Sequence, residues 1–281
     1  MLRQRIITAL VLVALLLPAL FARAGWPFAL LTLLMIAAAG WEWARLNATS
    51  SAAAIALGAL LAAACAATLA GPWAAQAPRW LFTLASLAWI LGGAAALRAG
   101  PAAWPRLPQA LRLALGLLLL WAGWLALVQA RGIGINFILS TLCLVWMADI
   151  AAYFGGRAFG RRKLAPSISP GKSWEGVWSG QLGVLLLAGG WLAVESRWGA
   201  GRFDSASLFG ALLHALGPLL ALLALLALAG MSVVGDLIES LVKRAVGAKD
   251  SSRLLPGHGG VLDRIDALLP VFPLAMAFAT R

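Results

Sequence analysis

This chain has little charge. Only 11% of its 281 residues are Asp, Glu, Lys or Arg, whereas a soluble domain has about 25%. Hydrophobic residues make up 62% of the chain, and they fall in blocks of roughly twenty, which is enough for a helix to cross a bilayer. These two features exclude an ordinary soluble domain. We therefore expect an all-α, polytopic helical membrane protein.

Cysteine and histidine are also scarce, with two of each. Cys65 and Cys143 lie inside apolar blocks without CxxC or metal-ligand spacing, so we interpret both as packing residues. His214 stands alone in an apolar block and is interpreted as a helix residue. The net charge of +12 does not indicate nucleic acid, because the basic residues gather in short segments between apolar blocks.

Nine apolar blocks are predicted to span the membrane. They cover approximately 6–22, 26–44, 52–70, 80–97, 113–130, 133–154, 177–194, 208–229 and 267–280. The first resembles a signal peptide, but it is long for one and the next block follows at once, so a retained helix is favoured. Gly217-Pro218 interrupts the eighth block and makes the count ambiguous by one.

The basic residues predict the orientation. With nine crossings and a cytoplasmic N-terminus, most of the 22 Lys and Arg residues lie on the cytoplasmic side. We divide the chain into an N-terminal transmembrane region, 1–130, with about five spans, and a catalytic transmembrane region, 131–281. The second region contains two charge-rich loops, 149–176 and 232–266, which this topology places on the same face. Glu42, at the end of the second block, is expected to pair with Arg45 at the membrane interface.

The segment 232–266 holds five of the ten acidic residues. Asp236 and Glu239 are three apart, as are Asp263 and Asp266, so each pair can share a helix face. Carboxylates among apolar residues are costly unless they have a partner, and hard oxygen ligands suit Mg²⁺. The alternative is ion pairing within the membrane, such as Asp263 with Arg264 or Glu239 with Lys243.

A glycine-rich turn, PGHGG at 256–260, lies between these pairs. Its glycines would let backbone N–H groups approach a ligand, and His258 is expected to be accessible. In the other loop, SPGKS at 169–173 is not a Walker A motif, because Pro166 stands where the first glycine belongs and no strand is expected before it. Lys172 and Ser173 still precede a predicted helix at Trp174 and could bind phosphate. The Arg161-Arg162-Lys163 cluster would contact anionic headgroups or hold a lipid phosphate.

The run from Ser240, SLVKRAVGAKDSSRLLPGHGGVLDRID, resembles the signature of the phosphatidate cytidylyltransferase family. The block DIAAYFGGRAFGRRKLAPSISPGKSWEG is similar to that family's second shared region. The resemblance is dense over about 149–176 and 235–266 and is only a general pattern of spans over the first 130 residues. It implies Mg²⁺-dependent synthesis of CDP-diacylglycerol and pyrophosphate from CTP and phosphatidate. It also implies a homodimer with a cytoplasmic site in a bacterial inner membrane.

The resemblance and the residue types together predict the site. The expected catalytic residues are Asp236, Asp263, Asp266, Lys243, Arg244, Lys249 and His258. The three aspartates are the predicted metal ligands, with a second cation left open. The three basic residues would hold the CTP phosphates, and the histidine would lie beside the leaving pyrophosphate. The expected substrate-binding residues are Asp149, Tyr153, Arg157, Arg161, Lys163, Ser169, Lys172, Ser173, Glu175, Glu239, Asp250, Gly259, Gly260 and Arg264.

Three other functions are open to a protein of this kind. A transporter would spread its acidic residues through the middle of the membrane, whereas here they cluster beside predicted turns. A CDP-alcohol phosphotransferase would carry a DG–AR–G–D–D spacing, which this chain lacks. An inactive membrane scaffold would not need the complete set of acidic residues.

Overall fold

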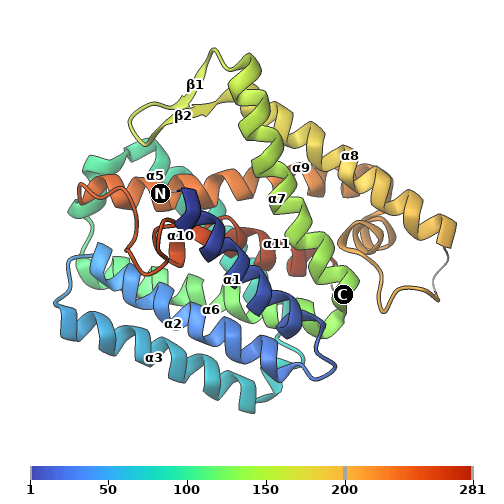
Figure 1. Cartoon of the computed structure of the whole chain (residues 1–281). Helices are drawn as coiled ribbons and strands as arrows, with labels where there is room; N and C mark the ends of the chain where they lie inside the picture. Colours follow the sequence, from blue (N-terminus) through green and yellow to red (C-terminus); the bar gives the residue numbers. More distant parts are fainter. Residues whose placement is uncertain (1, 199–200, 280–281) are drawn as a thin grey trace.

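The computed structural model describes residues 2–198 and 201–279, and this part of the chain is almost entirely helical (Figure 1). Its helices are α1 Leu2–Phe21, α2 Trp26–Leu46, α3 Ser51–Ala70, η1 Pro72–Ala74, α4 Arg79–Leu87, η2 Ala88–Gly92, α5 Gly93–Ala99, η3 Pro101–Arg106, α6 Gln109–Ile133, α7 Ile135–Phe159, α8 Trp174–Trp198, α9 Leu208–Ala245, α10 Leu262–Ile265 and α11 Leu268–Ala279. The predicted fold class, a polytopic helical membrane protein, is confirmed.

Within the described residues, seven helices are long and apolar enough to cross a membrane. They are Trp26–Leu46, Ser51–Ala70, Arg79–Ala99, Gln109–Ile133, Ile135–Phe159, Trp174–Trp198 and Leu208–Ala245. The other two predicted spans also form helices, but Ile6–Phe21 in α1 and the 12-residue α11 are shorter than the roughly 20 residues that a crossing usually needs. By this criterion, seven of the nine predicted spans are confirmed within the described residues.

Helix α9 covers 38 residues but is kinked at the predicted break, where the backbone of Gly217 is not helical. Gly217 takes a positive φ of 76°, which relieves the chain where Pro218 cannot donate a backbone hydrogen bond. At a rise of 1.5 Å per residue, the 28 residues from Pro218 to Ala245 would measure about 42 Å, beyond the roughly 30 Å of a hydrocarbon core. The first part of the segment 232–266 is thus the C-terminal end of α9 and not a loop.

Helices α7 and α8 pack closely through small residues. A Cβ atom on Gly155 would lie 1.9 Å from Ser179 Oγ, and one on Gly180 would lie 2.9 Å from the Ala148 carbonyl oxygen. A short antiparallel hairpin, β1 Lys163–Ala165 and β2 Ser169–Ser173, joins the two helices (Figure 1). The prediction of no strand before SPGKS was therefore wrong, because this segment follows β1 and itself forms β2.

The two predicted regions share a core. Helix α11, from the C-terminal region, packs against α4 and α6 of the N-terminal region as well as α9. Phe272 of α11 is fully buried, as are Trp124 of α6 and Phe28 of α2. The N-terminal helices therefore support the end of the chain that follows the site.

A group of polar residues, here called the distal cluster, lies where the α8–α9 connection meets the start of α7. Asp204 accepts hydrogen bonds from the backbone N–H groups of Ile135, at 2.5 Å, and Asn136, at 3.0 Å. Glu195 accepts them from Asn136 Nδ2 and from the N–H and hydroxyl of Ser207. Partial burial acts to raise the pKa of Asp204, but its backbone hydrogen bonds outweigh this effect and hold the pKa below its usual value.

Candidate active site

The two predicted loops meet through an ion pair. Lys172 Nζ, at the end of β2, lies 2.6 Å from Asp236 Oδ2 on α9. Both side chains keep part of their surface exposed, 25% and 34% respectively. Asp149 on α7 interacts electrostatically with both of them. The segments 149–176 and 232–266 therefore meet, and that they form one site stays a prediction.

Lys243 forms a second, more deeply buried ion-pair group. Its ammonium contacts Glu239, one turn earlier on α9, and lies 2.5 Å from Asp263 Oδ1 on α10. The three side chains are only 5–10% exposed. The Glu239–Lys243 pair that the sequence left open as an alternative is thus present. Asp263 pairs with Lys243, whereas the side chain of Arg264 is exposed.

Both oxygen atoms of the Asp263 carboxylate accept hydrogen bonds. Its Oδ2 accepts hydrogen bonds from the N–H and hydroxyl of Ser251, both at 2.9 Å, and from the N–H of Gly260 at 2.7 Å. Burial acts to raise the pKa of Asp263, but its interactions with Glu239, Lys243 and the Gly260 N–H outweigh this effect and lower the pKa. Asp263 is therefore held ionised.

The glycine-rich turn wraps around these carboxylates. Gly259 has a φ of +84°, and a Cβ atom there would lie 2.6 Å from Asp263 Oδ2. A Cβ atom on Gly260 would lie 2.0 Å from Ser251 Oγ and 2.3 Å from Glu42 Oε1. In the structure these glycines admit carboxylates of the chain itself. That their N–H groups also approach a ligand stays a prediction.

Glu42, on α2, was missed as a site residue. Its carboxylate is fully buried and accepts hydrogen bonds from the hydroxyls of Ser251, at 3.2 Å, and Ser252, at 2.5 Å. The backbone N–H groups of Val261, at 3.0 Å, and Leu262, at 2.7 Å, also donate to it.

The expected interfacial pair of Glu42 and Arg45 is therefore wrong. The Arg45 guanidinium lies over the Trp41 ring, 4.8 Å from its centroid. An acidic residue inside an apolar block was the available signal, but the neighbouring tryptophans favoured an interface.

Each neighbouring pair of carboxylates at the site joins two different elements and not two residues of one helix. Besides the Glu239–Asp263 link through Lys243, Asp266 interacts with Asp236. Burial and the nearby Asp236 carboxylate raise the pKa of Asp266 to about 7. The buried Oε1 of Glu239 has no hydrogen-bond partner.

These features bear on the predicted metal ligands. Among the described residues, no three His, Cys, Asp or Glu side chains are grouped as a metal site. Lysine ammonium groups lie against the carboxylates instead. The donor set nevertheless fits a divalent cation, because it offers hard oxygen atoms, a crowded pair of aspartates and one unpartnered carboxylate oxygen.

The α7–β1–β2–α8 segment holds the remaining predicted residues of the first loop. Ser173 Oγ accepts a hydrogen bond from the Gly176 N–H and so caps α8, which begins at Trp174 as predicted. Glu175 accepts hydrogen bonds from the backbone N–H groups of Arg161 and Arg162, which gives it a structural role in this turn. Of the predicted residues in this segment, Tyr153, Arg157, Arg161 and Lys163 are exposed and Ser169 is partly buried.

The other predicted residues of the second segment differ in exposure. Arg244 connects the two loops by donating to the carbonyl oxygens of Ile168 and Ala248. Lys249 and Asp250 are exposed. His258 is less accessible than predicted, because its Nδ1 is buried and has no hydrogen-bond partner.

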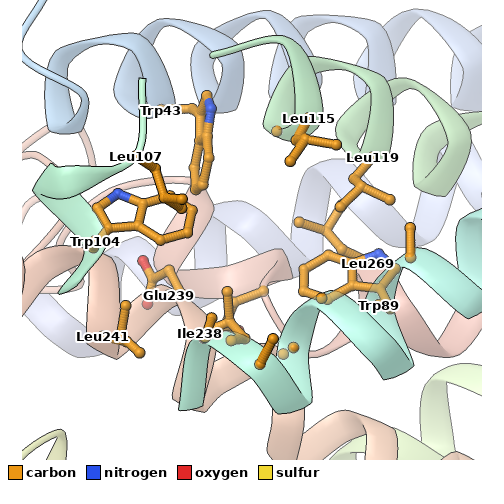
Figure 2. Close-up of a pocket in the computed structure, with 18 of the residues that line it drawn as sticks. Trp43, Trp89, Trp104, Leu107, Leu115, Leu119, Ile238, Glu239, Leu241 and Leu269 are labelled. Atoms are coloured by element: carbon orange, nitrogen blue, oxygen red, sulfur yellow. The ribbon is translucent and has the colours of Figure 1, made fainter. Parts of the chain in front are cut away.

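The lysines and carboxylates described above, here called the active-site cluster, are Lys172, Asp236, Glu239, Lys243, Asp263 and Asp266. Two cavities of different character adjoin this cluster. An apolar cavity of about 490 Å³ lies between α5, η3, α6 and α9, and its lining includes Glu239 and Asp266 (Figure 2). Trp43, Trp89 and Trp104 form part of its wall. A polar cavity of about 740 Å³ lies at the other side of the turn, lined by Arg45, Lys249, Arg253, Ser251 and Ser252 among others.

Over about half its length the chain is similar to known bacterial proteins. The chain is 45% identical over 168 residues to the phosphatidate cytidylyltransferase of Pseudomonas aeruginosa, covering 59% of this chain and 56% of the relative. It is 47% identical over 145 residues to that of Haemophilus influenzae, covering 52% and 46%. It is also 37% identical over 159 residues to the uncharacterized protein YnbB of Escherichia coli, covering 56% and 47%. The chain thus spans about half the length of the curated relatives it matches.

The family model described as the cytidylyltransferase family matches residues 3–280, nearly the whole chain. The match includes both segments that form the site and the N-terminal helices that supply Glu42. This protein is a member of the cytidylyltransferase family.

Proposed function

We propose that this chain transfers the cytidylyl group of CTP to phosphatidate and so makes CDP-diacylglycerol and pyrophosphate. The observation that carries the proposal is the cluster of lysines and carboxylates between an apolar and a polar cavity. An enzyme that joins a lipid to a water-soluble nucleotide needs such a boundary. The relatives named phosphatidate cytidylyltransferase support this reaction.

The reaction needs little proton transfer. A phosphate oxygen of phosphatidate would attack the α-phosphorus of CTP, the bond to the β-phosphate would break, and pyrophosphate would leave. A phosphate monoester has its second pKa near 6, so it is largely dianionic at neutral pH. Catalysis therefore depends on positioning the two phosphates and offsetting their charge, which is work that Lys172 and Lys243 are placed to do.

Asp236, Asp263 and Asp266 are the residues that would hold Mg²⁺. The cation would offset the charge of the CTP phosphates when bound. Lys243 Nζ contacts Asp263 Oδ1, so this lysine would have to turn toward a phosphate for that oxygen to serve as a ligand. Its flexible stem and compact charge suit such a movement.

The two cavities give each substrate a side of approach. The apolar cavity would take an acyl chain of the lipid, since nearly all its wall is hydrocarbon or aromatic surface that lipid can cover. The polar cavity would take the nucleotide, with Lys249, Arg253 and Arg45 near its phosphates. Arg157 and Arg161 remain candidates for the lipid phosphate because their side chains are exposed beside the loop that carries Lys172.

By the charge pattern, we further propose that the N-terminus and this site face the cytoplasm of a bacterium, where CTP is available. The resemblance of the sequence to the phosphatidate cytidylyltransferase family supports a homodimer. A transporter is disfavoured, because the acidic groups at the site are paired with lysines or held by backbone N–H groups next to a turn.

The experiment uses purified protein in detergent with phosphatidate, Mg²⁺ and CTP labelled at the α-phosphate. We expect label in the lipid phase, and EDTA should prevent its appearance. CTP labelled at the γ-phosphate is the matched control and should leave the lipid unlabelled. Absence of transfer from a folded, Mg²⁺-replete sample would rule the proposal out.

A further inference from the structure

Glu42 and Asp263 divide three consecutive backbone N–H groups between them. The N–H of Gly260 donates to Asp263, whereas those of Val261 and Leu262 donate to Glu42. The two carboxylates are thus neighbours along one stretch of backbone, although Glu42 belongs to α2.

The Ser251 hydroxyl lies between the two carboxylates and can donate its single proton to either of them. It lies 2.9 Å from Asp263 Oδ2 and 3.2 Å from Glu42 Oε2. Ser252, by contrast, donates to Glu42. Among the described residues, no Lys or Arg forms an ion pair with Glu42, so its buried charge depends on these hydrogen bonds.

We infer that Glu42 is a positioning residue that fixes Asp263. By accepting hydrogen bonds from both ends of the 251–262 segment, it closes that segment against α2 and orients the Gly260 N–H and Ser251 hydroxyl toward Asp263. Asp263 in turn faces Lys243 at the site. The consequence for turnover rests on the proposed function, whereas the consequence for the segment does not.

Glutamine is an informative substitution because it keeps the shape of Glu42 and replaces one acceptor oxygen by a donor. Each carboxylate oxygen of Glu42 accepts from one backbone N–H, Oε1 from Val261 and Oε2 from Leu262, and a backbone N–H can only donate. An amide NH₂ would therefore face a donor in either orientation. Glu195 of the distal cluster is the matched control. It is a carboxylate that also accepts from a backbone N–H, a serine hydroxyl and an amide side chain, but away from Asp263.

The first measurement does not depend on activity. We would compare backbone amide exchange in the purified full chain for wild type, Glu42→Gln and Glu195→Gln. Glu42→Gln should speed exchange at 260–262 by about tenfold or more, because a hydrogen bond to a charged group contributes that much. The decisive amide is that of Gly260, whose N–H donates to Asp263 and not to Glu42. Unchanged exchange at Gly260 would overturn the inference, and Glu195→Gln should not alter it.

The second measurement is steady-state kinetics. Glu42→Gln should lower kcat by about 10- to 100-fold, with KM for CTP and phosphatidate changed by less than about threefold, because the substrates do not touch Glu42 and only the site's geometry is lost. Glu42→Asp keeps the charge and should recover part of kcat. Glu195→Gln should retain wild-type kcat. A folded Glu42→Gln variant with kcat within twofold of wild type would overturn the inference.

Ser252→Ala covers the case in which Glu42→Gln does not fold. It removes one hydrogen bond to Glu42 and none to Asp263, so faster exchange at Gly260 and a lower kcat would support the inference, and no change in either would overturn it. If wild type itself transfers no label, the proposed function fails while the exchange result still decides whether Glu42 positions the segment.

Discussion

The distal cluster and the active-site cluster both hold carboxylates near α7, but they satisfy them differently. At the start of α7, Asp204 and Glu195 accept from backbone, amide and hydroxyl groups. At the site, beside Asp149, the carboxylates also contact the ammonium groups of Lys172 and Lys243. The 14 residues from Ile135 to Asp149 correspond to about 21 Å along the helix.

This difference separates a structural role from a chemical one. Neutral donors that are fixed in the backbone satisfy the hydrogen bonds of a carboxylate permanently, so the carboxylate does not change partner. A lysine on a flexible stem can turn from a carboxylate to a phosphate, and it leaves a carboxylate free for a cation. Asp263 combines both arrangements, since one oxygen meets fixed donors and the other meets Lys243.

The largest expected effect is that of Asp263→Asn. It removes the charge that Lys243 contacts while Glu239 remains to pair with this lysine, so the fold should survive. We expect the transfer rate to fall by about 1,000-fold or more, as when a main electrostatic group of a site is lost. The assay is label transfer to lipid, with size-exclusion chromatography to verify folding.

Asp204→Asn is the control for this substitution. Asp204 lies in the distal cluster, so its loss should leave the rate within about twofold of wild type, as expected for a change away from the site. If Asp263→Asn kept more than a tenth of wild-type activity, the carboxylates of the active site would not differ from those of the distal cluster in having a chemical role.

Gly260→Ala should have the next largest effect. The added Cβ atom would overlap Ser251 Oγ and Glu42 Oε1, and such overpacking typically costs about 1–3 kcal/mol. We expect lower thermal stability together with a marked loss of activity, because the displaced groups hold Asp263. Gly171→Ala is the control, since nothing lies within 4 Å of its added Cβ atom. Equal behaviour of the two variants would show that the turn does not need its glycine.

The sequence predicted the class of fold and that the two charge-rich segments lie on the same face. These features depend on apolar blocks and on local clusters of charge, which are visible along the chain. It did not predict how the carboxylates pair, because side chains on one helix face were expected to act together. In the structure Glu239 meets Asp263 through Lys243 and so pairs across two helices.

Glu42 could not be found from local pattern for a different reason. Its partners lie more than 200 residues away in the sequence, and no spacing rule connects α2 to the turn before α10. Contacts between distant segments thus decide what local propensity leaves open.

Lys172→Ala should have an intermediate effect. The variant leaves Asp236 without its partner at 2.6 Å and removes a charge placed to meet a phosphate. We expect activity to fall by about 10- to 100-fold, with folding retained because both side chains are partly exposed. Arg162→Ala is the control, since Arg162 is 78% exposed and its pair with Glu175 spans 3.6 Å. An unchanged rate for Lys172→Ala would reduce the β1–β2 hairpin to a structural connection.

The smallest expected effect is the pH dependence of the distal cluster. The pKa of Asp204 is lowered in the folded protein by the hydrogen bonds from Ile135 and Asn136. Its stabilising contribution is therefore fully present above the unfolded value of about 3.9 and is lost as the pH falls through the lower folded value. We expect wild type to melt slightly above Asp204→Asn at pH 7 and the difference to shrink below about pH 4. A difference in Tm that did not change with pH would mean that Asp204 stabilises α7 by shape and not by charge.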